Sequence, residues 1–202
     1  MRRSVFAVAA LAAALVPLAA AQAQDSGSWL VRGRAMYLDS ANKGVDGLSV
    51  NNKTFPEVDI TYFFSPNLAL ELVLTYPQKH DIRLEGVGTI GSLKHLPPTL
   101  SVQYHFPQVG FRPYIGAGIN YTRFSSVEFD PAVVAALDPS IDKDSFGLAV
   151  GVGVDVPFGG GWLFNVDLKK VQIRTDVDSL AGNLGTFKVD PLLFSIGIGK
   201  RF

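Results

Sequence analysis

Three histidines are the side chains of this sequence best suited to catalysis or metal binding. His80 and His95 lie in the segment 77–98, and His105 lies in a later stretch of alternating polar and apolar residues. With Asp81 beside it, His80 could join His95 in a metal site, but the compact ligand spacing of zinc motifs is missing. Solvated loop residues are the better interpretation of His80 and His95. The sequence therefore predicts no metal and no cofactor.

Glycine pairs could in principle bind phosphate. Gly116 and Gly118, like Gly151 and Gly153, lie within alternating stretches, and none of the glycine-rich segments opens a helix as a dinucleotide-binding loop must. We interpret the glycines as steric relief, because they leave room opposite four large charged side chains: Arg32, Arg34, Glu57 and Glu71. No arrangement of Ser, His and Asp is specific enough to predict an enzyme.

Nine charged residues are the strongest candidates for a functional network, since each occupies the polar face of an otherwise apolar alternating stretch. They are Arg32, Arg34, Glu57, Asp59, Glu71, Asp155, Asp167, Lys169 and Arg201. An unpaired charge away from water costs several kcal/mol, so we expect these groups to pair across neighbouring strands. Such a network would fill a narrow interior.

The elements that must position these residues are strands. Apolar residues recur with period two in eight stretches of about ten residues, the length that a tilted strand needs to cross a bilayer. The stretches are 29–38, 56–64, 68–76, 99–106, 112–124, 145–157, 162–169 and 192–202. A soluble sandwich would also alternate, but its polar faces would be rich in Lys and Glu, whereas these carry Gly, Ser, Thr and isolated charges. The prediction is an all-β fold, an eight-stranded antiparallel transmembrane β-barrel.

The beginning of the chain predicts secretion. Arg2 and Arg3 precede an apolar run, and the small-residue motif Ala21-Gln22-Ala23 follows it, so we expect residues 1–23 to be a cleaved signal peptide and 24–202 the barrel. The absence of Cys means that backbone hydrogen bonds and packing must hold the fold together. Eighteen basic and 18 acidic residues show no basic excess, so nucleic acid is not an expected partner.

The connections alternate in length. Those at 65–67, 107–110 and 158–161 are short, and those at 39–55, 77–98, 125–144 and 175–187 are long, so we expect short periplasmic turns and long extracellular loops. The phase of the seventh stretch slips at Lys170, which predicts a bulge or an exit from the bilayer there.

The long loops are unusually apolar. Residues 133–137, between Pro131 and Pro139, predict a short helix, and the second loop carries Ile82, Leu84, Val87, Ile90, Leu93 and Leu96. These residues suggest a hydrophobic funnel. Packing of the loops on one another, or contact with lipopolysaccharide, explains them equally well.

Three prolines mark the extracellular ends of two neighbouring strands. Pro77 closes the third stretch, and Pro97 and Pro98 open the fourth. Because proline donates no backbone hydrogen bond, the ladder between these strands should be weak or interrupted and could form a lateral exit. The competing reading is that these prolines merely end the strands.

Several motifs together resemble the outer membrane protein W (OmpW) family, which includes the alkane importer AlkL. They are DITYFF at 59–64, PNLALE at 66–71, PQKH at 77–80, LPPT at 96–99, QYHF at 103–106, RPYIGAGINY at 112–121 and DP at 190–191. The resemblance implies an outer-membrane barrel of a Gram-negative bacterium and, for some members, a narrow passage that releases small apolar molecules sideways into the bilayer. It also implies that Phe202 is read by the barrel-assembly machinery, although Lys200 replaces the aromatic residue usual two positions earlier.

Three function classes follow, in order of preference. The first is passive uptake of small hydrophobic molecules, the second a phage or colicin receptor or a structural barrel without transport, and the third a lipid-modifying enzyme. An eight-stranded barrel is barely wide enough for its own side chains, which argues against a water-filled pore. The expected partners are outer-membrane lipid, lipopolysaccharide, small apolar solutes and the assembly machinery, and the expected state is a monomer.

Overall fold

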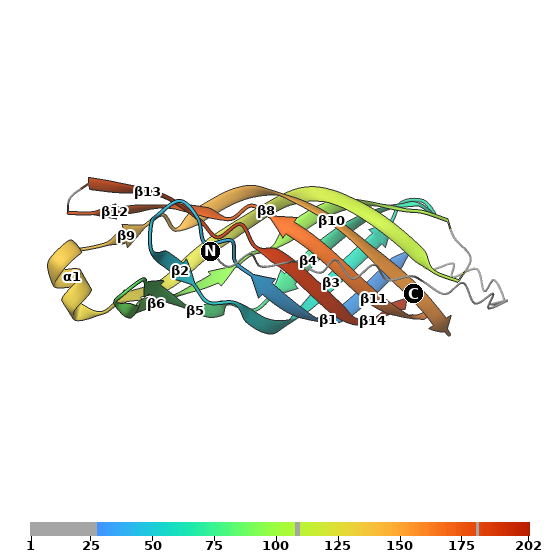
Figure 1. Cartoon of the computed structure of the whole chain (residues 1–202). Coiled ribbons are helices and arrows are strands. Elements are labelled where there is room, and N and C mark those ends of the chain that lie inside the picture. The colour runs from blue at the N-terminus through green and yellow to red at the C-terminus, as the bar shows by residue number, and fades with distance from the viewer. Residues whose placement is uncertain (1–27, 108–109, 181) are drawn as a thin grey trace, which may run out of the picture.

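The computed structural model describes residues 28–107, 110–180 and 182–202 and shows a closed antiparallel barrel of eight strands (Figure 1). Each barrel strand pairs with the next in the chain, and β14 returns to β1. The predicted fold class is confirmed, whereas the predicted signal peptide lies outside the described residues. The barrel strands are β1 Trp29–Asp39, β3 Lys53–Phe63, β4 Leu68–Thr75, β7 Thr99–His105, β8 Arg112–Phe129, β10 Asp144–Gly159, β11 Trp162–Val171 and β14 Leu192–Arg201.

Alternation of side chains between the two faces of each strand explains the barrel. Along β1, Leu30, Arg32 and Arg34 are buried inside, while Trp29 and Val31 are exposed outside. The outside of the barrel is therefore apolar and the lower inside is polar, the reverse of a soluble protein. This period-two pattern is the one that the sequence predicted.

Glycines stand where large interior side chains approach the backbone. A methyl group on Gly153 would lie 2.3 Å from the ring of Tyr114. One on Gly197 would lie 2.8 Å from Cγ of Arg34, and one on Gly199 would lie 2.8 Å from Cγ of Arg32. The steric interpretation is confirmed for these two arginines.

The long connections are folded rather than irregular, which the sequence analysis did not predict. The second contains the hairpin β5 Gln78–Leu84 and β6 Gly88–Leu96, which extends the barrel because β6 pairs with β8. A second small sheet stands beside it. This small sheet consists of β9 Ser140–Ile141, β12 Arg174–Ser179 and β13 Gly182–Lys188. The strand β2 Leu48–Val50 pairs with β5. The predicted short helix is present as α1 Pro131–Leu137.

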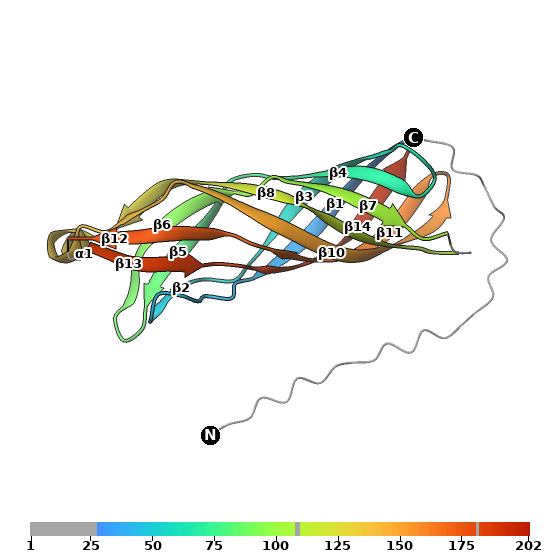
Figure 2. The same cartoon turned by 90° about the horizontal axis from the view of Figure 1, so that it is seen from above.

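All these extra elements lie at one end of the molecule, and the short turns lie at the other (Figures 1 and 2). By the general rule for such barrels, the elaborate end is extracellular and the short-turn end is periplasmic. Within the described ranges, no helix is long and apolar enough to cross a membrane.

Of the two alternatives predicted at Lys170, the bulge is wrong. Lys170 pairs in continuous register with Val150 on one side and Leu192 on the other, and β11 extends to Val171. The lysine points outward at the upper rim, where its Nζ donates to the backbone carbonyl of Asp190. A register shift occurs instead at the other end of the hairpin, between Pro157 and Gly159.

Candidate functional site

The lower interior of the barrel contains a buried ion-pair network, and Arg32 forms one half of it. Its Nη1 lies 2.8 Å from Oδ1 of Asp59 and its Nη2 lies 2.7 Å from Oδ2 of Asp155, a carboxylate more than 120 residues away in the chain. Nη1 also donates to Thr61, and Asn165 donates to Asp155 at 2.8 Å. Three strands, β1, β3 and β10, thus meet at a single guanidinium.

The other half of the network surrounds Arg34 and Lys169. Arg34 pairs with Glu57 through Nε, and its Nη2 lies 3.5 Å from Oε1 of Glu71 and 3.1 Å from Oδ2 of Asp59. Lys169 Nζ lies 2.8 Å from Glu71 and 3.2 Å from Asp167. Eight of the nine charges predicted for the interior are brought into one connected cluster of three cations and five carboxylates.

The ninth, Arg201, lies lower, where its guanidinium sits 4.0 Å from the ring centroid of Phe63. Beside it, the His105 ring packs between Phe63 and Tyr114, at 4.9 and 4.8 Å between centroids. Tyr114 in turn donates to Asp167 at 2.8 Å. The network and these rings are buried in the interior of the barrel towards its periplasmic end.

Above the network lies an apolar cavity of about 380 Å³ at the extracellular end. It is lined by Val45, Asp46, Leu48, Val50, Ile82, Leu84, Ile90, Leu93, Phe129, Val133, Leu137, Pro139, Ile141, Thr175, Val177, Leu184 and Phe187. Volumes of this size suit a small organic molecule. We call this cavity the loop pocket.

The structure places four of the six predicted funnel residues in the wall of the loop pocket: Ile82, Leu84, Ile90 and Leu93. Val87 stands exposed at the tip of the β5–β6 hairpin, and Leu96 lies below the pocket wall. The first and fourth loops also contribute to the wall, which was not predicted from the sequence. In the fourth, Thr175 and Val177 alternate with acidic residues, a strand signal that could have revealed them.

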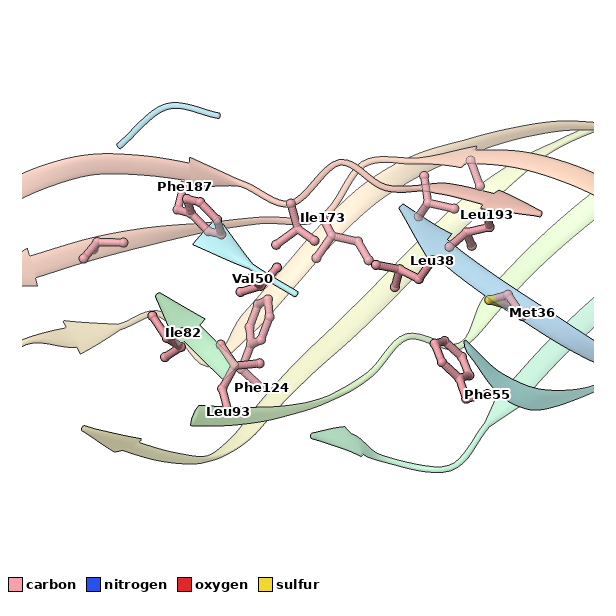
Figure 3. Close-up of a cluster of buried hydrophobic side chains, with 14 of the residues drawn as sticks. Met36, Leu38, Val50, Phe55, Ile82, Leu93, Phe124, Ile173, Phe187 and Leu193 are labelled. Carbon is pink, nitrogen blue, oxygen red and sulfur yellow. The ribbon is translucent and has the colours of Figure 1, made fainter. Parts of the chain in front are cut away.

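Apolar side chains continue from the loop pocket down towards the barrel (Figure 3). In Figure 3, Phe187 and Val50 lie towards the loop end of this cluster on the left, Ile173 in the middle, and Leu38 and Phe55 towards the barrel on the right. Two small cavities of about 20 Å³ each interrupt the packing. The lower of them is bounded by the top of the charge network and by Thr75, Pro97 and Thr99 in the barrel wall.

The barrel wall is interrupted at this lower cavity. The last paired residues of β4 and β7 are Val73 and Thr99, and the next pair above them is Gln78 with His95. Between these two pairs, no strand pairing joins 74–77 to 96–98 in this fully described part of the chain. The three prolines predicted to form the lateral rim, Pro77, Pro97 and Pro98, all lie in the interruption.

Side chains, not the opposite strand, satisfy much of the backbone at this interruption. Nδ2 of Asn120 donates to the carbonyls of Pro97 and Pro98 at 3.2 and 3.1 Å, and Nε2 of Gln78 donates to the carbonyl of Tyr76 at 3.0 Å. The two amides satisfy carbonyls that the interrupted ladder leaves without a partner on the opposite strand, and the N–H of Tyr121 in β8 also donates to the Pro98 carbonyl at 3.1 Å. The sequence analysis did not identify either residue, although both are inward-facing amides at the same rim.

His80 and His95 are buried side by side, so their interpretation as solvated loop residues is wrong. Their rings stack at 4.6 Å beneath the loop pocket, and both line the upper small cavity. Burial, aided by the neighbouring His80 and Lys53, lowers the pKa of His95 to about 3, and burial also lowers the pKa of His80. Both rings are therefore neutral at pH 7. Among the described residues, no group of three or more His, Cys, Asp or Glu is placed to hold a metal ion.

The end of the chain closes the barrel seam. Phe202 is exposed, and its backbone pairs with Trp29, whose N–H donates to the Phe202 carbonyl and whose carbonyl accepts from the Phe202 N–H at 2.8 Å. Lys200 Nζ lies 4.9 Å from the ring centroid of Trp162, at the level where aromatic residues meet the periplasmic headgroups.

Comparison with known proteins agrees with this geometry. The sequence model of the OmpW family matches residues 27–202. Outer membrane protein W of Escherichia coli is 35% identical over 207 residues, which cover 96% of this chain and 98% of the relative. The dibenzothiophene metabolism operon protein PahQ of Pseudomonas aeruginosa is 34% identical over 131 residues, 59% of each chain.

Solved structures give the same result. The crystal structure of OprG from Pseudomonas aeruginosa superposes with a TM-score of 0.76 at 29% identity, covering 87% of this chain and 96% of that one. The structure of outer membrane protein AlkL in lipid bilayers superposes with a TM-score of 0.63 at 25% identity, covering 87% and 90%. The chain is an outer-membrane protein of a Gram-negative bacterium and belongs to the OmpW family.

Proposed function

We propose that this barrel takes up small apolar molecules passively, collecting them in the loop pocket and releasing them sideways into the bilayer between β4 and β7. The observation that carries the proposal is the interruption of the strand ladder at 74–77 and 96–98, because it coincides with a cavity inside the barrel. An apolar molecule that leaves there enters lipid directly. It never has to cross the periplasmic half of the interior.

The charge network supports a lateral route over an axial one. Arg32, Arg34 and Lys169 are tied to five carboxylates below the cavity, and breaking such buried pairs is costly. Displacing them with an apolar molecule would leave charges without partners. The lateral route leaves the network intact.

The relatives support the chemical class. PahQ is named for an operon of dibenzothiophene metabolism, and dibenzothiophene is an apolar aromatic molecule. We also propose that the barrel is a monomer among outer-membrane lipids and lipopolysaccharide. The assembly machinery would recognise the C-terminal Phe202 and insert the barrel into the membrane. Reception of a phage or colicin stays the alternative if no uptake is found.

The lateral route can be tested by closing the wall. Continuing the register of Val73 with Thr99 brings Thr75 opposite Pro97, and both residues line the lower cavity. A cysteine pair at these two positions, oxidised to a disulfide, should reduce uptake of octane by cells with an intact lipopolysaccharide leaflet to the rate of cells lacking the protein. Reductant should restore the uptake.

A matched control carries the cross-link in a continuous part of the wall. Ile60 and Leu72 are direct partners in β3 and β4, so a cysteine pair there should leave octane uptake unchanged. Uptake of a small sugar should be negligible in every variant. Equal uptake by oxidised and reduced Thr75/Pro97 variants would refute the lateral route.

A further inference from the structure

Above the charge network, four side chains have buried polar atoms without a hydrogen-bond partner among the described residues. The atoms are Oγ1 of Thr75, Oε1 of Gln78, Nε2 of His80 and Nε2 of His95. Gln78, His80 and His95 are each less than 5% exposed. An unpaired buried polar atom costs about 1–3 kcal/mol, so four of them together need an explanation.

These four residues are neighbours along the chain or across the pairing of β5 with β6, and we call them the polar track. Gln78 and His80 both point inward from β5, and His95 on β6 is the direct partner of Gln78. The two imidazoles line the small cavity beneath the loop pocket, and Thr75 lines the cavity at the wall interruption. The track therefore begins at the floor of the loop pocket and ends at the proposed exit.

The unpaired polar atoms of the track belong to uncharged groups. Two of them can only accept a hydrogen bond, and the other two can donate or accept one. His80 donates its Nδ1–H to the carbonyl of Asn51 at 2.9 Å, which leaves Nε2 of the neutral ring as an acceptor. Oε1 of Gln78 is also an acceptor, whereas the Thr75 hydroxyl and the His95 ring can donate or accept. A carboxylate would meet lone pairs here, and a plain hydrocarbon would leave all four atoms unpaired.

We propose that the track recognises small apolar molecules that carry a hydroxyl group, such as phenols or alcohols. The inference rests on the uptake function proposed above and narrows its substrate class. A hydroxyl satisfies both kinds of partner, because it donates to Nε2 of His80 or Oε1 of Gln78 and accepts from His95 or Thr75. The apolar remainder of the molecule stays against the apolar wall of the interior.

Phenol and toluene are the appropriate probes, because they differ only in a hydroxyl that replaces a methyl group. Binding of each to the purified, lipid-reconstituted protein can be measured by displacement of a fluorescent apolar dye. His80→Phe removes the acceptor but keeps an aromatic ring for stacking on His95. We expect it to weaken phenol binding about tenfold, the equivalent of one hydrogen bond, and to leave toluene binding unchanged.

Two further variants separate the track from general effects. Thr75→Val removes the hydroxyl at the exit without changing the shape of the side chain and should also weaken phenol selectively. His105→Phe replaces a buried histidine in the lower barrel, outside the track, and should change neither affinity. Nitrogen NMR of labelled histidine should show the His80 Nε2 resonance moving on addition of phenol but not of toluene.

The outcomes distinguish this inference from the proposed function. If toluene binds and phenol loses nothing in His80→Phe, the track serves bound water only and the inference is overturned, while apolar uptake stands. If phenol binds without moving the Nε2 resonance, the inference is likewise overturned. If neither molecule displaces the dye from the unaltered protein, the proposed function itself fails.

Discussion

Loss of a cation from the lower interior should destabilise the barrel more than loss of a carboxylate. Among the described residues, the ion pairs of the cluster join three cations to five carboxylates, and the guanidinium of Arg201 lies below them against Phe63. Lys169→Met deprives Glu71 and Asp167 of a partner at 2.8 and 3.2 Å and leaves two arginines among five carboxylates. Removing one partner of a buried pair costs about 3–5 kcal/mol, and we expect this variant to reach that range.

Removing a carboxylate instead, by Glu71→Gln, should lower the free energy of unfolding less than Lys169→Met does. Gln keeps an oxygen that can accept from Lys169 and Arg34, and the cluster becomes more nearly balanced in charge. The loss is then that of one charge-assisted hydrogen bond, about 1.5–3 kcal/mol. The two variants should differ by about 2 kcal/mol, with Lys169→Met the less stable.

Chemical unfolding from lipid vesicles, followed by the fluorescence of Trp29 and Trp162, measures this difference. Lys79→Met is the matched control, because that side chain is exposed on β5, and it should lie within about 0.5 kcal/mol of the unaltered protein. Equal free energies of unfolding for Lys169→Met and Glu71→Gln would refute the argument from charge balance. A control as unstable as Lys169→Met would refute the role of burial.

Two further results are expected. Gly153→Ala should lower the free energy of unfolding by about 1–3 kcal/mol in the same assay, because its methyl group would collide with the Tyr114 ring. Gly33→Ala is the control and should cause no such loss, because a methyl group there meets nothing within 4 Å. Similar losses in the two variants would contradict the steric role of Gly153. Because burial lowers the pKa of His95 to about 3 from its usual 6.5, the folded loops bind fewer protons than opened ones, so their stability is complete above about pH 6.5 and falls on acidification towards pH 3. At pH 5 the folded loops should have lost about 2 kcal/mol of stability. This loss should appear as faster amide hydrogen exchange in β5 and β6, after correction for the intrinsic exchange rates. The same pH dependence in a His95→Phe variant would contradict the role of His95.

The membrane-spanning part of the fold could be predicted because lipid imposes a strict pattern on every strand. Alternation placed Arg32, Glu57 and Glu71 inside the barrel correctly, since each stands between two outward apolar residues. It also suggested a bulge or an exit from the bilayer at Lys170, and the bulge is absent because the register is continuous there. That lysine keeps its outward position because it lies at the rim, within reach of a backbone carbonyl.

The extracellular half could not be predicted as well, because its burial depends on contacts between distant loops. His95 is covered by the stacked His80 and by Phe124 of β8, and nothing in the residues next to it indicates this. The loop pocket likewise combines four separate connections. Gln78 and Asn120 were missed because their role exists only where the strand ladder stops, and the sequence located that break by its prolines alone.

The length of β8 sets the height at which this protein meets its surroundings. Its 18 residues span about 60 Å at about 3.3 Å each, or about 45 Å along the barrel axis at a tilt of about 40°. The apolar band of such a barrel is only about 25 Å tall. The mouth of the loop pocket thus stands about 20 Å clear of the hydrocarbon. In the uptake proposed above, this height would let an oily molecule be collected on the water side of the lipopolysaccharide sugars, which would otherwise be its main obstacle.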